Sequence, residues 1–322
     1  MLSCVRKNRQ VVVPPMSGYD SGVHLLDGKY VVVSTDPCIG VPEDWFGWLL
    51  INYAASDVAL FGAKPEFCTI NLLGPKSTTL KTLQAAMLQT CQAADELDMA
   101  VVTGHTGTYG GLSKLVGVCT AYGTVTPEKL ITPGDAKPGD AILCTQPIGL
   151  ETIVNFSIMH KSLAQRLFGA EQTRELATQV NLQSCVREAL LLAKVGGVHA
   201  MHDATEGGFV SALNELAEAS ELGFGVDFEE IPIPPEVNKL QEWFRLSDEQ
   251  VLAMSSTGTI MVAVDAQARE KVVNTLAKKG FSAYFLGEFT KNKNRILLRS
   301  NKEMAFPKTA HDPYGMILSG CV

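Results

Sequence analysis

Hydrophobic residues form two patterns along the chain, continuous runs and helical spacing, and each pattern predicts one type of secondary structure. Continuous β-branched runs over 30–36 and 99–106 predict buried strands that carry polar residues at their carboxyl ends. Apolar residues at helical spacing predict helices over 48–61 and 80–97. Strand character returns over 115–125, so the first part of the chain is expected to mix helices and strands.

A polar stretch with two breakers of the Pro-Gly type, residues 132–140, interrupts this pattern and is expected to connect two domains. The elements expected beyond it are strands over 140–145, 258–264 and 282–289, and helices within 149–195 and over 209–219 and 267–279. Mixed elements in both halves predict an α/β or α+β protein of two domains, residues 1–135 and 136–322.

The charge balance narrows the class of partner. The chain has 322 residues, and 27 Lys and Arg against 34 Asp and Glu give a formal net charge of −7. That balance argues against a broad basic face for nucleic acid or for an anionic membrane. No signal peptide pattern and no apolar run of about 18 residues is found, so we expect a soluble, cytoplasmic protein. The eight cysteines are scattered singly, which favours buried reduced thiols.

Three acidic residues stand where a lone carboxylate is costly. Asp36 ends the strand expected over 30–36, Asp57 lies inside an apolar helical segment, and Asp20 lies in a glycine-containing turn. Burial of such charges is tolerated when a cation shares the site. Three carboxylates without a nearby basic residue suit Mg²⁺, which is usually held jointly by carboxylates and substrate phosphates. Taken singly, each acid also has a local explanation as a turn residue, a loop cap or a locally hydrogen-bonded acid.

Two glycine-containing segments are candidate anion sites. His105 follows Gly104 at the end of an expected strand, where backbone amides of the next turn can face an anion, or where the histidine is simply a satisfied loop residue. Asp203, Thr205 and Gly207 come just before an amphipathic helix, whose free amides can hold phosphate or be capped by these side chains. The fingerprints of P-loop, Rossmann, zincin and α/β-hydrolase proteins are absent.

In their order along the chain these motifs resemble those of the AIR synthase (PurM) superfamily. That group includes aminoimidazole ribonucleotide synthetase, the hydrogenase maturation protein HypE, thiamine-monophosphate kinase and selenophosphate synthetase. The resemblance spans nearly the whole chain and rests on Gly18-Tyr19-Asp20, Ser34-Thr35-Asp36, Asn52-x4-Asp57-x4-Gly62-Ala63, Thr103-Gly104-His105-Thr106, His202-Asp203-Ala204-Thr205-Glu206-Gly207-Gly208 and Ser255-Ser256-Thr257-Gly258-Thr259.

The resemblance implies a two-domain PurM-like fold. The sheet of the N-terminal domain, residues 1–135, would form a barrel across a homodimer, and residues 136–322 would form a C-terminal α/β domain. The cofactors it implies are ATP and Mg²⁺, with the metal on Asp20, Asp36 and Asp57. The cofactor-binding residues it implies are Asp20, Asp36, Asn52, Asp57, Gly104, His105, Thr106, Thr205 and Gly207. The catalytic candidates are Asp203, Lys114 and His105; Lys114 can neutralise phosphate charge or be an ordinary loop lysine.

Within the superfamily the second half of the chain is most similar to HypE, but two features depart from it. The cysteine Cys321 is penultimate, without the Pro-Arg-Ile that precedes the last residue of HypE. His105 stands where HypE and thiamine-monophosphate kinase have Asp. We expect a HypE-like or AIR synthase-related enzyme that activates a small substrate by phosphoryl transfer from ATP. The alternatives are a thiamine-monophosphate kinase-like enzyme and a non-catalytic dimeric scaffold that binds a maturation partner.

Overall fold

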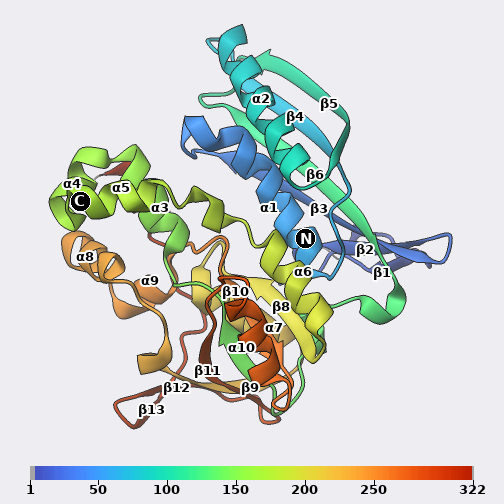
Figure 1. Ribbon diagram of the computed structural model, residues 1–322, viewed down its shortest axis with the longest axis vertical. Helices are drawn as coiled ribbons and strands as arrows, with labels where there is room; N and C mark the ends of the chain where they lie inside the picture. Colours follow the sequence, from blue (N-terminus) through green and yellow to red (C-terminus); the bar gives the residue numbers. More distant parts are fainter. Residues whose placement is uncertain (1–3, 321–322) are drawn as a thin grey trace. The chain divides into compact units, whose positions relative to one another are not determined.

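The chain folds into two compact units, each with its own β-sheet. The computed structural model describes residues 4–320. The chain divides after Leu130 into Met1–Leu130 and Ile131–Val322. Each unit contains one mixed sheet with helices packed on it (Figure 1). The prediction of mixed helices and strands in both halves is therefore confirmed.

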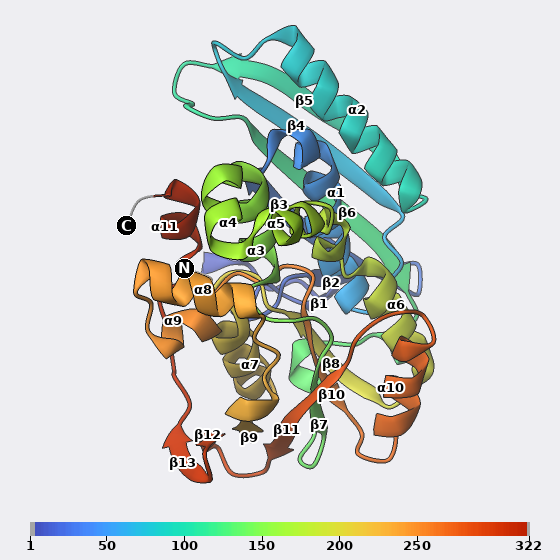
Figure 2. The same cartoon turned by 60° about the vertical axis from the view of Figure 1, so that its left-hand side comes forward.

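The first unit is built on a six-stranded sheet in the order β1-β2-β3-β6-β4-β5. Its elements are β1 (Val11–Val13), β2 (Gly22–Leu26), β3 (Lys29–Ile39), η2 (Glu43–Trp45), α1 (Phe46–Leu60), β4 (Phe67–Pro75), α2 (Leu80–Glu96), β5 (Ala100–Tyr109), β6 (Val116–Val125) and η3 (Pro127–Lys129). β4 and β5 run parallel because α2 carries the chain back between them, and the other neighbouring strands are antiparallel. Figure 1 and Figure 2 show α1 and α2 on one face of this sheet.

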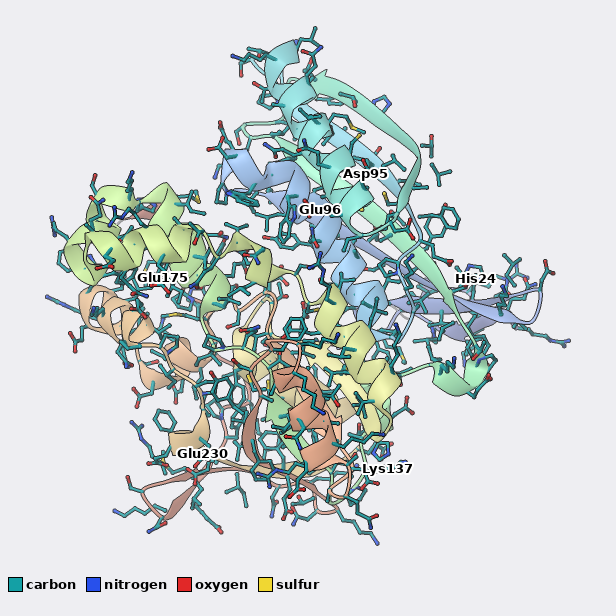
Figure 3. The ribbon with its side chains drawn as sticks, viewed as in Figure 1. His24, Asp95, Glu96, Lys137, Glu175 and Glu230 are labelled. Carbon is teal, nitrogen blue, oxygen red and sulfur yellow. The ribbon has the colours of Figure 1, made fainter. Side chains whose placement is uncertain are left out.

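The helix α1 is buried on almost every side. It packs against β3, β6 and α2, and an apolar helix without a polar face is typical of an element covered all round. Its approach to α2 is so close that a Cβ on Gly47 would lie 2.3 Å from the Ala86 carbonyl oxygen. At the other end of the contact, Trp48 Nε1 donates a 3.0 Å hydrogen bond to the carboxylate of Glu96, which Figure 3 labels.

Two strands of the first unit differ from the expectation. β3 does not end at Asp36 but continues to Ile39, because its pairing with β6 runs from Tyr30 to Ile39. β5 coincides with the strand expected over 99–106, but it is exposed along most of its length, with Val102 at 55%. β5 is the edge strand, so its apolar run marks an uncovered strand and not a buried one.

The second unit contains a seven-stranded sheet in the order β13-β12-β9-β11-β7-β10-β8. Its strands are β7 (Ala141–Cys144), β8 (Val198–Asp203), β9 (Gly223–Asp227), β10 (Ile260–Val264), β11 (Tyr284–Thr290), β12 (Arg295–Arg299) and β13 (Lys302–Ala305). Its helices are η4 (Pro133–Asp135), α3 (Leu150–Met159), α4 (Lys161–Phe168), α5 (Ala170–Ala177), η5 (Val180–Gln183), α6 (Val186–Val195), α7 (Gly208–Ala219), η6 (Phe228–Glu230), α8 (Pro235–Phe244), α9 (Asp248–Leu252), α10 (Arg269–Ala277) and α11 (Tyr314–Ser319). β9 and β12 are parallel, and the other neighbouring pairs are antiparallel.

The core of the second unit surrounds β10, whose five residues are all buried between β7 and β8. On α7, the ring of Phe209 packs edge-on against Phe306, and Phe306 meets Phe224 of β9 at a centroid distance of 4.9 Å. The helical tract expected within 149–195 is interrupted, because Gly169 leaves the helical conformation at φ +95° and η5 separates α5 from α6.

The cysteines largely follow the expectation of buried thiols. Cys38, Cys68, Cys119, Cys144 and Cys185 are buried, whereas Cys4 and Cys91 are exposed. Cys321 lies outside the described residues. None of the helices between residues 4 and 320 combines the length and the apolar character that a bilayer crossing requires.

Glu188 on α6 is a buried carboxyl group of the second unit. The residue is 1% exposed, and Gln146 Nε2 donates to its Oε1 at 3.2 Å. Burial raises the pKa of Glu188 to about 8, although the Gln146 hydrogen bond opposes this shift. The folded chain therefore keeps this proton at pH values where an unfolded chain, with a pKa near 4.5, has lost it.

We predict that Glu188 makes the chain less stable as the pH rises from about 4.5 to about 8, because over this window the folded state binds a proton that the unfolded state has released. Glu188→Gln should remove this component and raise the free energy of unfolding near the upper end of the window by roughly 1–3 kcal/mol. Urea denaturation at both ends of the window measures it. The control is Glu175→Gln, an exposed acid on α5 (Figure 3). An unchanged pH dependence in Glu188→Gln would contradict the assignment.

Candidate functional site

The candidate metal-binding acids of the first unit centre on Asp57. This residue lies in the last turns of α1 and is 7% exposed, inside an otherwise apolar helix. Ser34 of β3, itself buried, donates its hydroxyl to Asp57 Oδ2 at 2.6 Å. A buried carboxylate that accepts a short hydroxyl bond is held in one orientation, with lone pairs left for further donors or a cation.

Asp36 follows Ser34 by two positions on β3, so both side chains leave the same face of the strand. Across the ladder Asp36 faces Cys119 of β6. The pKa of the Cys119 thiol is raised by a hydrogen bond with Cys68, by burial and by the nearby charges of Cys68, Asp36 and Asp57. One thiol therefore senses both carboxylates, which places Asp36 and Asp57 in a common neighbourhood behind the sheet.

The next two predicted site residues of the first unit are Asn52 and Asp20. Asn52 is buried on α1, but its Nδ2 donates to the Trp48 carbonyl oxygen at 2.9 Å, and it lies about 140° around the helix from Asp57. Asp20 follows Tyr19, whose ring packs at 6.3 Å on Phe61 at the end of α1. Of these described residues, Asp20, Asp36 and Asp57 do not bring one carboxylate oxygen each within 4.8 Å of one another.

The segment Gly104-His105-Thr106 does not end its strand, as the sequence suggested, but lies in the middle of β5, which continues to Tyr109. Gly104 is required because a Cβ there would lie 2.3 Å from the Ile70 carbonyl oxygen of β4. His105 and Thr106 are exposed on this edge strand. The imidazole Nε2 of His105 lies 2.8 Å from the Tyr109 hydroxyl, so a hydrogen bond fixes the ring along the strand.

Lys114 lies in the exposed loop between β5 and β6. Its Nζ is 3.9 Å from the position that a Cβ on Gly40 would take, just beyond the end of β3. The lysine therefore belongs to the same end of β3 that carries Asp36. Its side chain is exposed, as is usual for a lysine.

In the second unit the predicted residues cluster where β8 ends. Asp203 is the last residue of β8 and is 6% exposed, and Thr205 Oγ1 donates to its Oδ2 at 2.6 Å. The neighbouring His202 points its Nδ1 toward the Asp203 carbonyl oxygen at 2.8 Å. Its Nε2 is 2.8 Å from the Glu215 carboxylate on α7. The end of β8, the residue Thr205 after it and α7 therefore bring acid, imidazole and hydroxyl groups together.

A second loop, 254–259, meets the first one. Thr257 Oγ1 donates to the buried Glu151 at 2.5 Å and lies 3.5 Å from Thr205 Oγ1. This loop needs a glycine at Gly258 for two reasons. A Cβ there would lie 1.9 Å from the Leu182 carbonyl oxygen, and the φ of Gly258 is +95°. Two threonine hydroxyls thus connect two buried carboxylates, Glu151 and Asp203.

Gly207 has a partner that the sequence did not suggest. It precedes α7 with a φ of +74°, as an N-cap of this geometry requires. Its backbone N–H donates to Asp312 Oδ2 at 3.2 Å, and Asp312 also accepts from Ser255. The amide expected to meet a phosphate therefore meets a carboxylate of the same chain. The only sequence signal at Asp312 is an Asp-Pro pair before α11, which is typical of a local turn.

We predict that Ser34→Ala lowers the free energy of unfolding by about 1–3 kcal/mol without added metal, because the buried Asp57 carboxylate loses a hydroxyl donor. Chemical denaturation monitored by circular dichroism measures the change. Thr35→Ala is the matched control, because Thr35 is exposed and its hydroxyl forms a hydrogen bond with another hydroxyl, that of Thr120. Equal losses in the two variants would contradict a special role for the Ser34 bond.

Comparison with known proteins gives relatives that span most of the chain. A putative hydrogenase expression/formation protein of Methanocaldococcus jannaschii is 25% identical over 287 residues, 87% of this chain and 82% of the relative. A carbamoyl dehydratase HypE of Cupriavidus necator is 27% identical over 250 residues, 75% of this chain and 68% of the relative.

Solved structures share the fold at lower identity. HypE in complex with ATP gives a TM-score of 0.74 at 19% identity, over 88% of this chain and 86% of the other. The HypE–HypF complex gives 0.71 at 20%, over 88% and 92%. Thiamine monophosphate kinase from Aquifex aeolicus gives 0.69 at 15%, over 88% and 92%. These likenesses establish the two-domain PurM-like fold.

Two family models match the sequence itself. The N-terminal domain of AIR synthase related proteins matches residues 18–125, and the C-terminal domain matches residues 137–298. Together the two matches cover most of the chain and include the loops described above. The chain belongs to the AIR synthase related protein family.

Proposed function

We propose that the chain is an ATP- and Mg²⁺-dependent, HypE-like enzyme that activates a small substrate by phosphoryl transfer from ATP. The observation that carries this proposal is the buried Asp57 carboxylate, oriented by Ser34 and accompanied by Asp36 on the same face of β3. Two carboxylates and a hydroxyl at one place are the kind of oxygen ligands that a hard cation such as Mg²⁺ takes.

The donor set fits magnesium. The groups at this place are carboxylate and hydroxyl oxygens, which suit a hard cation better than a transition metal. Asp36 and Asp57 would hold the ion, with Asp20 contributing from the segment that Tyr19 anchors on α1. Because the three carboxylates do not close on one point by themselves, phosphate oxygens would complete the coordination. Bound Mg²⁺ would supply charge neutralisation for the transferred phosphoryl group.

The remaining family motif residues would orient the nucleotide and substrate. In the first unit these are Asn52, Gly104, His105, Thr106 and Lys114; Lys114 would neutralise phosphate charge. In the second unit Asp203 would accept a proton from the nucleophile, and Thr205 would hold its carboxylate in place. Phosphoryl transfer from ATP to a substrate oxygen leaves ADP and an activated group, so positioning carries most of the catalysis.

The relatives support this reading. HypE has been solved with ATP, and curated relatives carry the name carbamoyl dehydratase. The fold of thiamine monophosphate kinase supports a kinase of that type as the second candidate. The HypE–HypF complex supports a further role, in which the chain binds a maturation protein, either as an enzyme or as a scaffold without catalysis.

We further propose that residues 1–135 form the ATP-binding and dimerisation domain, that residues 136–322 form the second domain, and that the chain works as a cytoplasmic homodimer. β5 supports the dimer, because it is an edge strand whose apolar side chains Val101 and Val102 are exposed. An uncovered apolar edge is expected to pair with another strand. A second copy of the same sheet would cover it and close a barrel.

We predict that Asp36→Asn and Asp57→Asn each weaken Mg·ATP binding at least about ten-fold, because each variant removes a charged metal ligand while keeping the side-chain volume. Isothermal titration calorimetry with ATP, with and without Mg²⁺, measures the effect. Asp98→Asn is the control, because Asp98 is exposed and pairs with Lys64 at the surface. Unchanged Mg·ATP affinity in both site variants would refute the proposed function.

The dimer is tested separately. We predict that Val102→Lys converts the dimer to a monomer, because a buried lysine at a strand interface is disfavoured. Multi-angle light scattering measures the molar mass. Leu88→Lys introduces the same charge at an equally exposed leucine on α2 and should leave the dimer intact. A wild-type chain that is monomeric, or a Val102→Lys chain that stays dimeric, would contradict the proposed interface.

A further inference from the structure

The segment 307–319 crosses the second unit and is anchored at both ends. At its start, Asn214 Nδ2 of α7 donates to the Pro307 carbonyl oxygen at 2.8 Å. At its end, α11 lies against α3 (Figure 2), and Asn155 Nδ2 donates to the Tyr314 hydroxyl at 3.0 Å. The segment is thus tied to two helices that border the candidate loops of this unit.

Between these anchors Asp312 contacts both loops through one carboxylate. Its Oδ2 accepts from Ser255 Oγ at 2.6 Å and from the Gly207 backbone N–H at 3.2 Å. Its Oδ1 accepts from the Tyr314 N–H at 2.8 Å and from the Ser255 N–H at 3.4 Å. Four donors from three segments of the chain therefore converge on Asp312. Hydrogen bonds to an ionised acceptor are about twice as strong as neutral ones.

The two loops that Asp312 joins are the ones that carry the threonine hydroxyls. Gly207 comes two residues after Thr205, which donates to Asp203. Ser255 comes two residues before Thr257, which donates to Glu151. The hydroxyls of Thr205 and Thr257 are 3.5 Å apart, at the limit of a hydrogen bond. A change in the spacing of the loops would therefore change this contact.

We propose that Asp312 is a positioning residue, which clamps the loop of Thr205 to the loop of Thr257 and so sets the orientation of the Asp203 carboxylate. This inference rests on the proposed function. It assigns to Asp312 no contact with substrate or nucleotide. Its effect on catalysis passes through the Ser255 and Gly207 bonds to the two threonines.

A carboxylate suits this position because every one of its four contacts is to a donor. An asparagine of the same size would turn one oxygen into an N–H₂ group, which cannot accept, so two of the four bonds are lost in either orientation of the amide. It would also remove the negative charge beside the first turn of α7, where an anion is favoured. Asp312→Asn therefore breaks part of the clamp without opening a cavity.

The test compares the wild-type chain with Asp312→Asn, Asp312→Glu and the control Glu303→Gln, an exposed acid on β13. Two quantities are measured on each full-length chain: ADP release from Mg·ATP, and hydrogen–deuterium exchange of peptides that cover residues 203–209 and 253–258. Asp312→Asn should exchange roughly ten-fold faster in both peptides. Its kcat should fall roughly ten-fold while the KM for ATP stays within about two-fold.

The other variants separate positioning from simple stability. Asp312→Glu keeps the charge and should recover part of kcat, and Glu303→Gln should match the wild type in both measurements. A wild-type kcat in Asp312→Asn would overturn the positioning role, whether or not exchange becomes faster. Unchanged exchange would overturn the clamp itself. A wild-type chain that neither binds nor turns over Mg·ATP would refute the proposed function, and the positioning role with it.

Discussion

The first unit depends on the closeness with which α1 packs between its neighbours. Glycines mark this constraint on both sides: a Cβ on Gly47 would meet the Ala86 carbonyl oxygen of α2, and one on Gly117 of β6 would meet the Leu50 side chain at 2.8 Å. Asp57 lies on this helix and is 7% exposed, so the packing that stabilises the helix also removes a carboxylate from bulk water, and Ser34 donates a hydrogen bond to it.

The second unit also contains buried carboxylates, and hydroxyl groups donate hydrogen bonds to them. Glu151 and Asp203 are both buried acids, and each accepts a short bond from a threonine. Each threonine lies on a loop whose path is fixed by a glycine, Gly207 or Gly258, with positive φ. In both units, then, small residues determine where the backbone runs, and hydroxyl side chains determine where the acids point. The buried carboxylates Asp57, Glu151 and Asp203 are therefore oriented by groups inside the fold.

Much of this arrangement was predictable from the sequence, for identifiable reasons. Period and β-branching located the strands and helices, and an acid inside an apolar helix indicated that Asp57 is buried. The exposure of β5 was not predictable, because an apolar run does not show whether another element covers the strand. Gly104 was expected beside an anion-binding turn, whereas it lies within β5 and gives clearance to the Ile70 carbonyl oxygen. Asp312 carried no periodic signal, because its partners come from distant segments.

The pairing of β3 with β6 has a consequence for how the chain folds. Asp36 lies opposite Cys119, and everything between them, including α1, β4, α2 and β5, must be synthesised before this ladder can form. Closing so long a loop is slow, because its entropy is lost before the contacts reward it. The strand that carries Ser34 and Asp36 therefore remains half paired on the ribosome until β6 has emerged. The strand that carries two of the residues proposed to bind metal therefore depends on a partner that is synthesised about 80 residues later.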